Sequence, residues 1–412
     1  LKPGLTQIFT VSAEGGPPRQ LTFAKAPIQS GLDWTPDGKH LIFSANLSER
    51  WQLEGVNVDL HELNVETGVI RALTGRNGPE GEPAVSPDGK WIAFTGFDDA
   101  GRAYEADELY LMPRSGGSIR SLTPRLDRAV SSPVWAADSR AIYVSFEDKG
   151  TTRVARVGLD GSIRTVAEGL TGSALDRPYT GGEFSVARDG TVAATVGGSL
   201  RPSDVAVARG GATRRLTRLN DELFAGKTLG SVEKVPVTAF DGKPIDAWLT
   251  LPPAASAGTR HPLILEIHGG PHSAYGPAFS TDNQLYATAG YAVLSVNPRG
   301  STSYGEAFAN EIDKSYPARD YDDLMSAVDA AIATGRIDPD NLFVTGGSGG
   351  GVLTAWIVGK TSRFRAAATQ KPVIDWASFA LTADNPTYFT KYWFGKAPWE
   401  DPQAYWSRSP LS

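Results

Sequence analysis

The chain has 412 residues, which is too long for one hydrophobic core and indicates two or three domains. Its 41% hydrophobic and 21% charged residues are typical of a soluble globular protein, and a net charge of −6 gives no sign of a nucleic-acid or anionic membrane partner. The absence of cysteine excludes disulfides, thiolate catalysis and cysteine-ligated metals, and no apolar run approaches the about 18 residues that a membrane span needs.

Two sequence units alternate through residues 1 to about 220. One is a tight turn followed by an apolar strand, as in WTPDGKHLIFS from Trp34, and the other is a pair of alternating strands, as in ELYLMPRSGGSIRSLT from Glu108. The turn aspartates recur at intervals of 51, 50 and 51 residues: Asp37, Asp88, Asp138 and Asp189. Four short strands in about 50 residues are typical of a β-propeller blade. Residues 1–225 are therefore predicted to form a β-propeller with four blades and part of a fifth, and the repeats resemble TolB-like repeats.

The turn aspartates are interpreted as structural. Aspartate and glycine suit tight turns between strands, whereas a calcium site needs several carboxylates that converge. One aspartate in each repeat does not offer that convergence.

Residues 226–412 alternate strands and helices after a polar link. A hairpin is predicted over 235–251, with its turn at Asp241 and Gly242. Strands are expected near 263–267, 292–296, 342–345 and 366–369, and helices near 282–289, 320–334 and 351–360. This alternation predicts an α/β domain with a doubly wound, mainly parallel sheet, whose ligands bind at the carboxyl ends of the strands.

The strongest motif is a serine among glycines, Gly346-x-Ser348-x-Gly350, between a predicted strand and a predicted helix. A strand that turns abruptly into a helix holds its turn residue in a strained conformation with the side chain projecting, as in the nucleophile elbow. Ser348 is therefore the candidate nucleophile. The alternative is a glycine-rich loop that contains an incidental serine.

A second motif, His268-Gly269-Gly270-Pro271, ends the predicted strand 263–267. Backbone N–H groups at such a turn can donate to the negative oxygen of a tetrahedral intermediate, together with the residue after the serine. The N–H groups of Gly270 and Gly349 are the candidate oxyanion hole. The alternative is a tight turn after a core strand.

Three stretches occur in a fixed order: HGGPHSAYG, then GYAVLSVNPRGSTSYG from Gly290, then TGRIDPDNLFVTGGSGGG. Together they resemble the prolyl oligopeptidase family of serine peptidases, and most closely its acylaminoacyl peptidase-like branch. The resemblance implies an α/β-hydrolase domain whose access is restricted by a β-propeller of about seven or eight blades. The N-terminal part of that ring is therefore expected outside this sequence. The chain departs from the family at Gly349, where many members carry tyrosine.

Four further residues are candidates for substrate binding. Arg299 and Tyr304 lie on the loop after the predicted strand 292–296, where they either brace the loop or position substrate. By resemblance, Trp376 and Phe379 fall where the family builds the pocket for the residue before the scissile bond. Aromatic residues are also common in plain core, which is the alternative for both.

A serine hydroxyl needs a general base, and in α/β-hydrolases the chain order is serine, acid, histidine. The five histidines, His40, His61, His261, His268 and His272, all precede Ser348, and the sequence ends 64 residues after Ser348. By resemblance, the family places the acid about 80 residues and the histidine about 115 residues after the serine, so Asp375, Asp384 and Asp401 come too early to be that acid. The triad aspartate and histidine are therefore expected beyond Ser412, in a C-terminal part of the catalytic domain that this sequence does not include.

The leading interpretation is a serine peptidase that hydrolyses short peptides through an acyl-enzyme on Ser348. One alternative is a carboxylic-ester hydrolase of the same fold, and another is a non-catalytic propeller binding protein with a decayed hydrolase domain. No cofactor or metal is expected, and the expected partners are small peptide substrates, with no nucleic acid and no membrane. A homo-oligomer, a cytoplasmic or periplasmic location, and the choice between exopeptidase and endopeptidase stay open.

Overall fold

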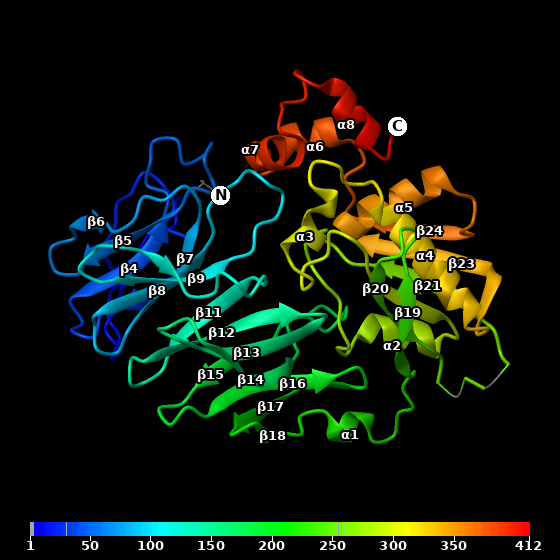
Figure 1. The fold of residues 1–412 in the computed structure, drawn as a ribbon, viewed down its shortest axis with the longest axis horizontal. Helices are drawn as coiled ribbons and strands as arrows, with labels where there is room; N and C mark the ends of the chain where they lie inside the picture. Colours follow the sequence, from blue (N-terminus) through cyan, green and yellow to red (C-terminus); the bar gives the residue numbers. More distant parts are fainter. Residues whose placement is uncertain (1–3, 30, 254, 257) are drawn as a thin grey trace.

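The computed structural model describes residues 4–29, 31–253, 255–256 and 258–412. Figure 1 shows two parts: radially arranged sheets, coloured blue to green, and a sheet flanked by helices, coloured green to red. We call strands β1 to β18 the propeller half and the elements from β19 onward the hydrolase half.

The first blades are separate four-stranded antiparallel sheets. One contains β3 (Leu32–Trp34), β4 (His40–Ala45), β5 (Asp59–Asn64) and β6 (Ile70–Ala72). The next contains β7 (Glu80–Val85), β8 (Trp91–Gly96), β9 (Glu108–Pro113) and β10 (Arg120–Ser121). They are preceded by a two-stranded sheet of β1 (Phe9–Thr10) and β2 (Arg19–Gln20).

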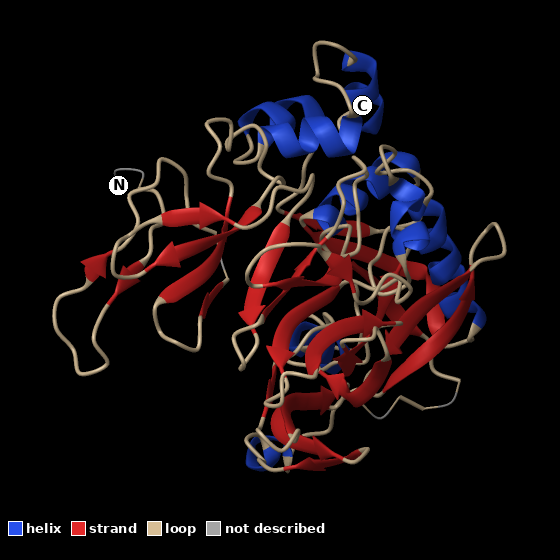
Figure 2. Ribbon diagram, turned by 60° about the vertical axis from the view of Figure 1, so that its left-hand side comes forward, coloured by secondary structure: helices blue, strands red, loops and turns tan. Residues whose placement is uncertain are grey.

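The third and fourth blades share one sheet because Leu170 pairs with Val196. The third has β11 (Val130–Trp135), β12 (Ala141–Asp148), β13 (Thr151–Gly158) and β14 (Ile163–Leu170). The fourth has β15 (Phe184–Val186), β16 (Val192–Gly198), β17 (Arg201–Arg209) and β18 (Ala212–Arg215). The prediction of four blades and part of a fifth is confirmed, and Figure 2 shows the sheets in red.

The four repeated aspartates lie in the predicted turns. Each accepts a hydrogen bond from the backbone N–H two residues further on, which is how aspartate stabilises a turn. The donors and their distances are Lys39 at 3.0 Å, Lys90 at 3.1 Å, Arg140 at 3.0 Å and Thr191 at 3.0 Å. These bonds support the structural interpretation of the aspartates.

The hydrolase half is built on one six-stranded sheet of order β19-β20-β22-β21-β23-β24. Helix α1 (Asp221–Phe224) precedes the hairpin of β19 (Val232–Thr238) and β20 (Pro244–Thr250). The other strands are β21 (His261–Ile267), β22 (Ala292–Asn297), β23 (Ile337–Gly347) and β24 (Ala366–Gln370). These four are mutually parallel, as predicted, although β23 begins earlier than expected. The domain boundary near residue 225 stays a prediction.

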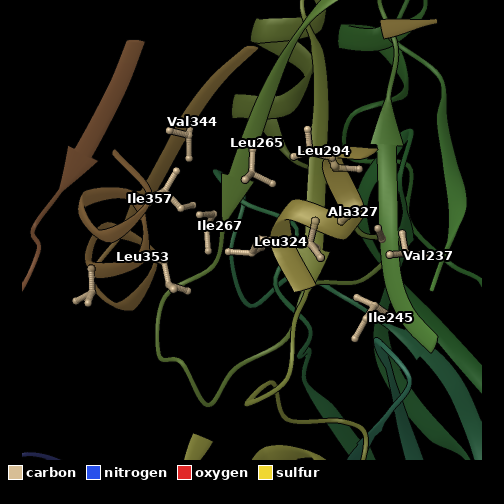
Figure 3. Packing of buried hydrophobic residues seen from close by; sticks show 14 of the residues in the cluster. Val237, Ile245, Leu265, Ile267, Leu294, Leu324, Ala327, Val344, Leu353 and Ile357 are labelled. Carbon is tan, nitrogen blue, oxygen red and sulfur yellow. The ribbon is translucent and has the colours of Figure 1, made fainter. Parts of the chain in front are cut away.

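Helices cover both faces of this sheet, as the sequence predicts. On one face, α4 (Asp320–Ala333) and α5 (Gly349–Lys360) contribute Leu324 and Leu353 to a buried cluster with Leu265 and Leu294, shown in Figure 3. Helix α2 (Thr281–Thr288) lies on the opposite face, where Asn283 donates to Ser295 Oγ at 3.2 Å. This packing fixes the sheet edge at which the strands end.

The remaining helices border that edge. They are α3 (Glu306–Ala309), the short η1 (Asn310–Ile312), α6 (Trp376–Thr382), α7 (Pro386–Tyr388), the π-helix η2 (Phe389–Phe394) and α8 (Pro402–Arg408). Figure 1 shows α6, α7 and α8 together at the top of the molecule. Within the described ranges, no helix has both the length and the apolar character needed to cross a membrane.

Candidate active site

Ser348 occupies the junction between β23 and α5 in a strained conformation. Its φ of 56° and ψ of −116° are rarely adopted by residues with a side chain. Ser348 is also exposed. Its backbone N–H donates to Gln370 O on β24 at 2.9 Å, which anchors the turn to the sheet. The strand, strained serine and helix together have the geometry of a nucleophile elbow.

The glycines around Ser348 allow the HGG turn to lie against the elbow. A Cβ on Gly350 would overlap the carbonyl oxygen of Ile267, and a Cβ on Gly349 would lie 2.9 Å from the Gly270 carbonyl carbon. Real Cβ atoms do not approach backbone atoms so closely, so Gly349 could not carry a side chain with the turn in this position. This contact gives a physical reason for the departure from the tyrosine of many family members.

Gly270 and Gly349 are thus brought together beside the serine. Neither backbone N–H donates a hydrogen bond to another part of the described chain. Gly349 is the first residue of α5, where N–H groups lack a partner within the helix. Two unpaired donors next to an exposed hydroxyl could stabilise a negative oxygen formed there.

His268 helps to orient the Gly270 N–H. Its Nδ1 lies 2.7 Å from the carbonyl oxygen of Gly269, so this nitrogen carries the proton, and its Nε2 lies 2.9 Å from Ser301 Oγ. In a trans peptide the C=O and N–H point in opposite directions, so the N–H of Gly270 points away from the imidazole. Burial lowers the pKa of His268 to about 4, and the ring is therefore neutral near pH 7.

The histidines near the site have other partners. His272 Nδ1 contacts Gly300 O at 2.9 Å, and burial lowers its pKa. Throughout the described residues, no histidine is hydrogen-bonded to Ser348. The general base of Ser348 is not identified among these contacts.

Arg299 lies at the centre of a buried ionic cluster. Only 3% of its side chain is exposed, and its guanidinium contacts Asp323 at 2.8 Å, Glu311 at 3.0 Å and Asp241 at 3.2 Å. The hydrogen bonds to Asp323 are the main cause of a raised arginine pKa. These contacts favour the bracing role that the sequence leaves open, rather than a contact with substrate.

Tyr304 ties the same loop to two strands. Its hydroxyl donates to Asp246 Oδ2 at 2.9 Å and accepts from Asn297 Nδ2 at 3.0 Å. Burial raises its pKa, so it stays protonated. The position of Tyr304 likewise favours bracing.

Trp376 and Phe379 belong to an aromatic cluster formed by α6 and η2. Trp376 is 2% exposed and stacks on Trp393 with ring centroids 5.6 Å apart. Phe379 meets Trp376 edge-on at 5.7 Å and is half-buried. Trp376 therefore has the surroundings of a core residue, whereas Phe379 retains surface that a ligand could contact.

A cavity of about 470 Å³ lies between the propeller half and the segment that follows the HGG turn. Its lining includes Asp107 and Glu147 from the propeller half and His272, Ser273 and Thr302 from the hydrolase half. Burial raises the pKa of Asp107 to about 7, and burial also raises the pKa of Glu147. A positive group in this cavity would favour the charged form of both carboxyls.

A contact that the sequence analysis did not predict comes from the loop between β14 and β15. The Tyr179 hydroxyl accepts a hydrogen bond from Gly269 N at 2.8 Å. The surrounding sequence, GSALDRPYTGG, has neither strand nor helix periodicity and matches none of the motifs discussed above. Nothing in the sequence therefore indicated that this loop reaches the HGG turn.

Comparison with known proteins defines the class. Residues 277–412 match the prolyl oligopeptidase family. The chain is 34% identical to the uncharacterized peptidase YuxL of Bacillus subtilis strain 168, over 98% of this chain and 75% of that protein. Dipeptidyl-peptidase 5 of Porphyromonas gingivalis is 26% identical, over 81% of this chain and 49% of the relative. The fold and the serine elbow define a serine peptidase. The chain belongs to the prolyl oligopeptidase family.

Solved structures share the fold. An acylaminoacyl peptidase of Pyrococcus horikoshii superposes with a TM-score of 0.78 at 22% identity, over 98% of this chain and 61% of that one. A puromycin-hydrolyzing peptidase of Mycobacterium tuberculosis superposes with a TM-score of 0.73 at 21% identity, over 98% of this chain and 72% of that one. At these identities the likeness concerns the fold. The predicted combination of β-propeller and α/β-hydrolase is confirmed.

Proposed function

We propose that this chain carries the nucleophile of a peptidase that cleaves short peptides by acyl transfer through Ser348. The observation that carries the proposal is the exposed, strained Ser348 in contact with the HGG turn. The match to a peptidase family supports peptides as the substrate class. The acylaminoacyl peptidase and the dipeptidyl-peptidases among its relatives support a preference for chain ends.

In the proposed reaction, Ser348 Oγ attacks the scissile carbonyl carbon and its proton passes to a general base. The carbonyl oxygen becomes negative and accepts hydrogen bonds from Gly270 and Gly349, each worth about 3 kcal/mol of barrier. Collapse of the intermediate breaks the C–N bond, and the departing amine takes the proton. Water then hydrolyses the Ser348 ester and regenerates the hydroxyl. The base is expected to be the triad histidine that the family resemblance implies.

Labelling with a fluorophosphonate probe tests this proposal in the full-length protein. The probe should attach to Ser348, and Ser348→Ala should abolish the label. Ser407→Ala, which removes an exposed serine on α8, is the matched control and should label like the wild type. An unlabelled wild-type protein, or a label that survives Ser348→Ala, would refute the proposal.

The acidic cavity favours a second, narrower candidate, in which the substrate presents a free amino group. Asp107 and Glu147 line the cavity, and the Glu147 carboxylate oxygens accept hydrogen bonds from Thr180 and Thr302. Two half-buried carboxyls can bind an ammonium group more favourably than a neutral acyl group. Matched peptides with free and acetylated amino termini distinguish the two candidates. If the enzyme requires a free amino group, kcat/KM should be at least about tenfold higher for the peptides with a free amino terminus. Glu147→Gln should reduce that preference.

A further inference from the structure

A loop of the propeller half is bound along the hydrolase half close to Ser348. We call residues 175–181 the strap. Its C-terminal part pairs with residues 274–276 through an antiparallel bridge between Tyr179 and Tyr275, and its N-terminal part accepts hydrogen bonds from the start of α2. The donor–acceptor pairs are Thr180 N to Ala274 O, Gly276 N to Pro178 O, Thr281 N to Leu175 O and Asp282 N to Asp176 O, at 2.8 to 3.1 Å. The strap is therefore held at several points along its length.

The strap reaches the serine site from two sides. On the elbow side, Arg177 Nη2 donates to Gln370 Oε1 at 3.0 Å, and Gln370 is the residue whose carbonyl binds the Ser348 N–H. Arg177 also lies against Gly347, where a Cβ would be 2.7 Å from its Nη1. The buried Glu266 pairs with Arg177 Nε at 2.9 Å and fixes the side chain in this place.

On the turn side, the Tyr179 hydroxyl binds the HGG turn directly. It accepts the Gly269 N–H at 2.8 Å, and a Cβ on Gly269 would lie 3.3 Å from this hydroxyl and 3.5 Å from Ser348 Cβ. The tyrosine ring packs edge-on against Tyr275 at 4.9 Å, which limits its movement. The hydroxyl and the serine therefore border the same small space.

We propose that Tyr179 is a positioning residue of the Ser348 site, supplied by the propeller half. Tyr179 binds the N–H of the His268–Gly269 peptide, and His268 binds the C=O of the Gly269–Gly270 peptide. Two consecutive peptides are thus fixed, and the second carries the Gly270 N–H that faces the reacting oxygen in the proposed mechanism. Without the Tyr179 bond, the first peptide can rotate and carry the donor away from the serine. The inference rests on the proposed function, because it assigns Tyr179 a part in that reaction.

Tyr179→Phe tests the inference, since it removes the hydroxyl and keeps the ring. Displacement of a reacting group or loss of an oxyanion donor lowers the rate about 100- to 1,000-fold. Here the donor is loosened rather than deleted, so we expect kcat to fall about 10- to 100-fold. KM should stay within about twofold, and the rate of fluorophosphonate labelling should fall by the same factor as kcat. A purely structural role of Tyr179 would not lower kcat while leaving KM unchanged.

Tyr275→Phe is the matched control, because its ring lies in the same aromatic contact and its hydroxyl makes no hydrogen bond to the HGG turn. It should retain wild-type kcat. Equal kcat values for Tyr179→Phe and Tyr275→Phe would overturn the inference. So would a loss of activity in Tyr179→Phe that appears entirely in KM. If Tyr179→Phe unfolds, Thr281→Val provides a second test: it removes a side-chain bond to the strap at Leu175 but leaves the Tyr179 hydroxyl, and should keep kcat. A Thr281→Val variant that folds and loses kcat as strongly as predicted for Tyr179→Phe would also overturn the inference. Failure of the wild-type protein to label would instead reject the proposed function.

Discussion

At the scale of single residues, the site depends on what side chains are absent as much as on the serine. Gly349 and Gly350 allow the backbone of β21 and its HGG turn to reach the elbow, since a Cβ at either position would meet main-chain atoms. Main-chain atoms cannot move aside as a flexible side chain can. The contact between the turn and the elbow is therefore a rigid feature.

Gly350→Ala should destabilise the protein by about 3 kcal/mol, because the new methyl group would overlap the Ile267 carbonyl. Gly359→Ala on the same helix is the control, since its Cβ would meet nothing within 4 Å. Removing a helical glycine there should raise stability by about 0.5 to 1 kcal/mol. Urea unfolding of both variants measures the difference, and similar effects of the two substitutions would contradict the packing described.

Asp320 gives a pH dependence that can be tested by one substitution. It is buried at the start of α4, and burial raises its pKa to about 7 from an ordinary value of 3.8. Between these pH values the folded state binds more protons than the unfolded state, so stability falls as the pH rises from about 4 to 7. The full loss is about 4 kcal/mol for this group.

Asp320→Asn should therefore reduce the stability difference between pH 5 and pH 8 by about 2 to 3 kcal/mol. Urea unfolding at the two pH values gives this quantity. Three other carboxyls have a pKa raised to about 7, act in the same direction and remain in the variant: Glu80, Asp107 and Glu266. A variant with the full wild-type pH dependence would show that Asp320 is ionised in the folded state.

At the scale of elements, a buried ionic cluster helps to hold the loop after β22. Arg299 connects α4, through Asp323, to the β19–β20 turn, through Asp241. Removing one partner from a buried ionic cluster leaves the others uncompensated. The loop precedes α3 and contributes Thr302 and Ser303 to the cavity, so its position also shapes the site.

Arg299→Ala should cost about 3 to 5 kcal/mol of stability while leaving KM unchanged in protein that remains folded. Arg363→Ala provides the control: it removes an ion pair to Asp329, whose side chain is 66% exposed, and should cost less than about 1 kcal/mol. Thermal unfolding compares the two. A large increase in KM with unchanged stability would return Arg299 to the substrate-binding role.

The sequence predicts the regular elements well, because each depends on local pattern. The repeats gave the blades through their turn aspartates, and the apolar runs gave the four parallel strands. Ser348 and the HGG turn were recognisable because only glycine, which lacks a Cβ, fits where the turn and the elbow come into close contact. The environment of Arg299 could not be predicted, since its three carboxylate partners lie at 12 to 58 residues' separation. The strap was missed because its contact with Gly269 spans 90 residues and follows no periodic pattern.

At the scale of the whole molecule, the propeller half and the hydrolase half are joined close to Ser348. Arg177 and Glu266 form a buried ion pair across the junction, and burial raises the pKa of Glu266 to about 7 despite the nearby guanidinium. Buried pairs add little to net stability but cost much when one member is removed. The junction is therefore sensitive to single substitutions.

Arg177→Met should destabilise the protein by about 3 to 5 kcal/mol, and more strongly at pH 8 than at pH 6, because Glu266 would then lack its counter-charge. The double variant Arg177→Met with Glu266→Gln should recover most of this loss. A double-mutant cycle by urea unfolding measures the coupling. Additive effects of the two substitutions would show that the pair does not join the halves.

In the proposed mechanism, Ser348 faces the N–H groups of Gly270 and Gly349. This arrangement can be examined in a crystal structure of the full-length protein after reaction with a fluorophosphonate. We expect phosphorus bonded to Ser348 Oγ, with one phosphonyl oxygen about 2.7 to 3.1 Å from both backbone nitrogens. A phosphonyl oxygen that points into solvent, away from both nitrogens, or an adduct on another residue, would contradict it.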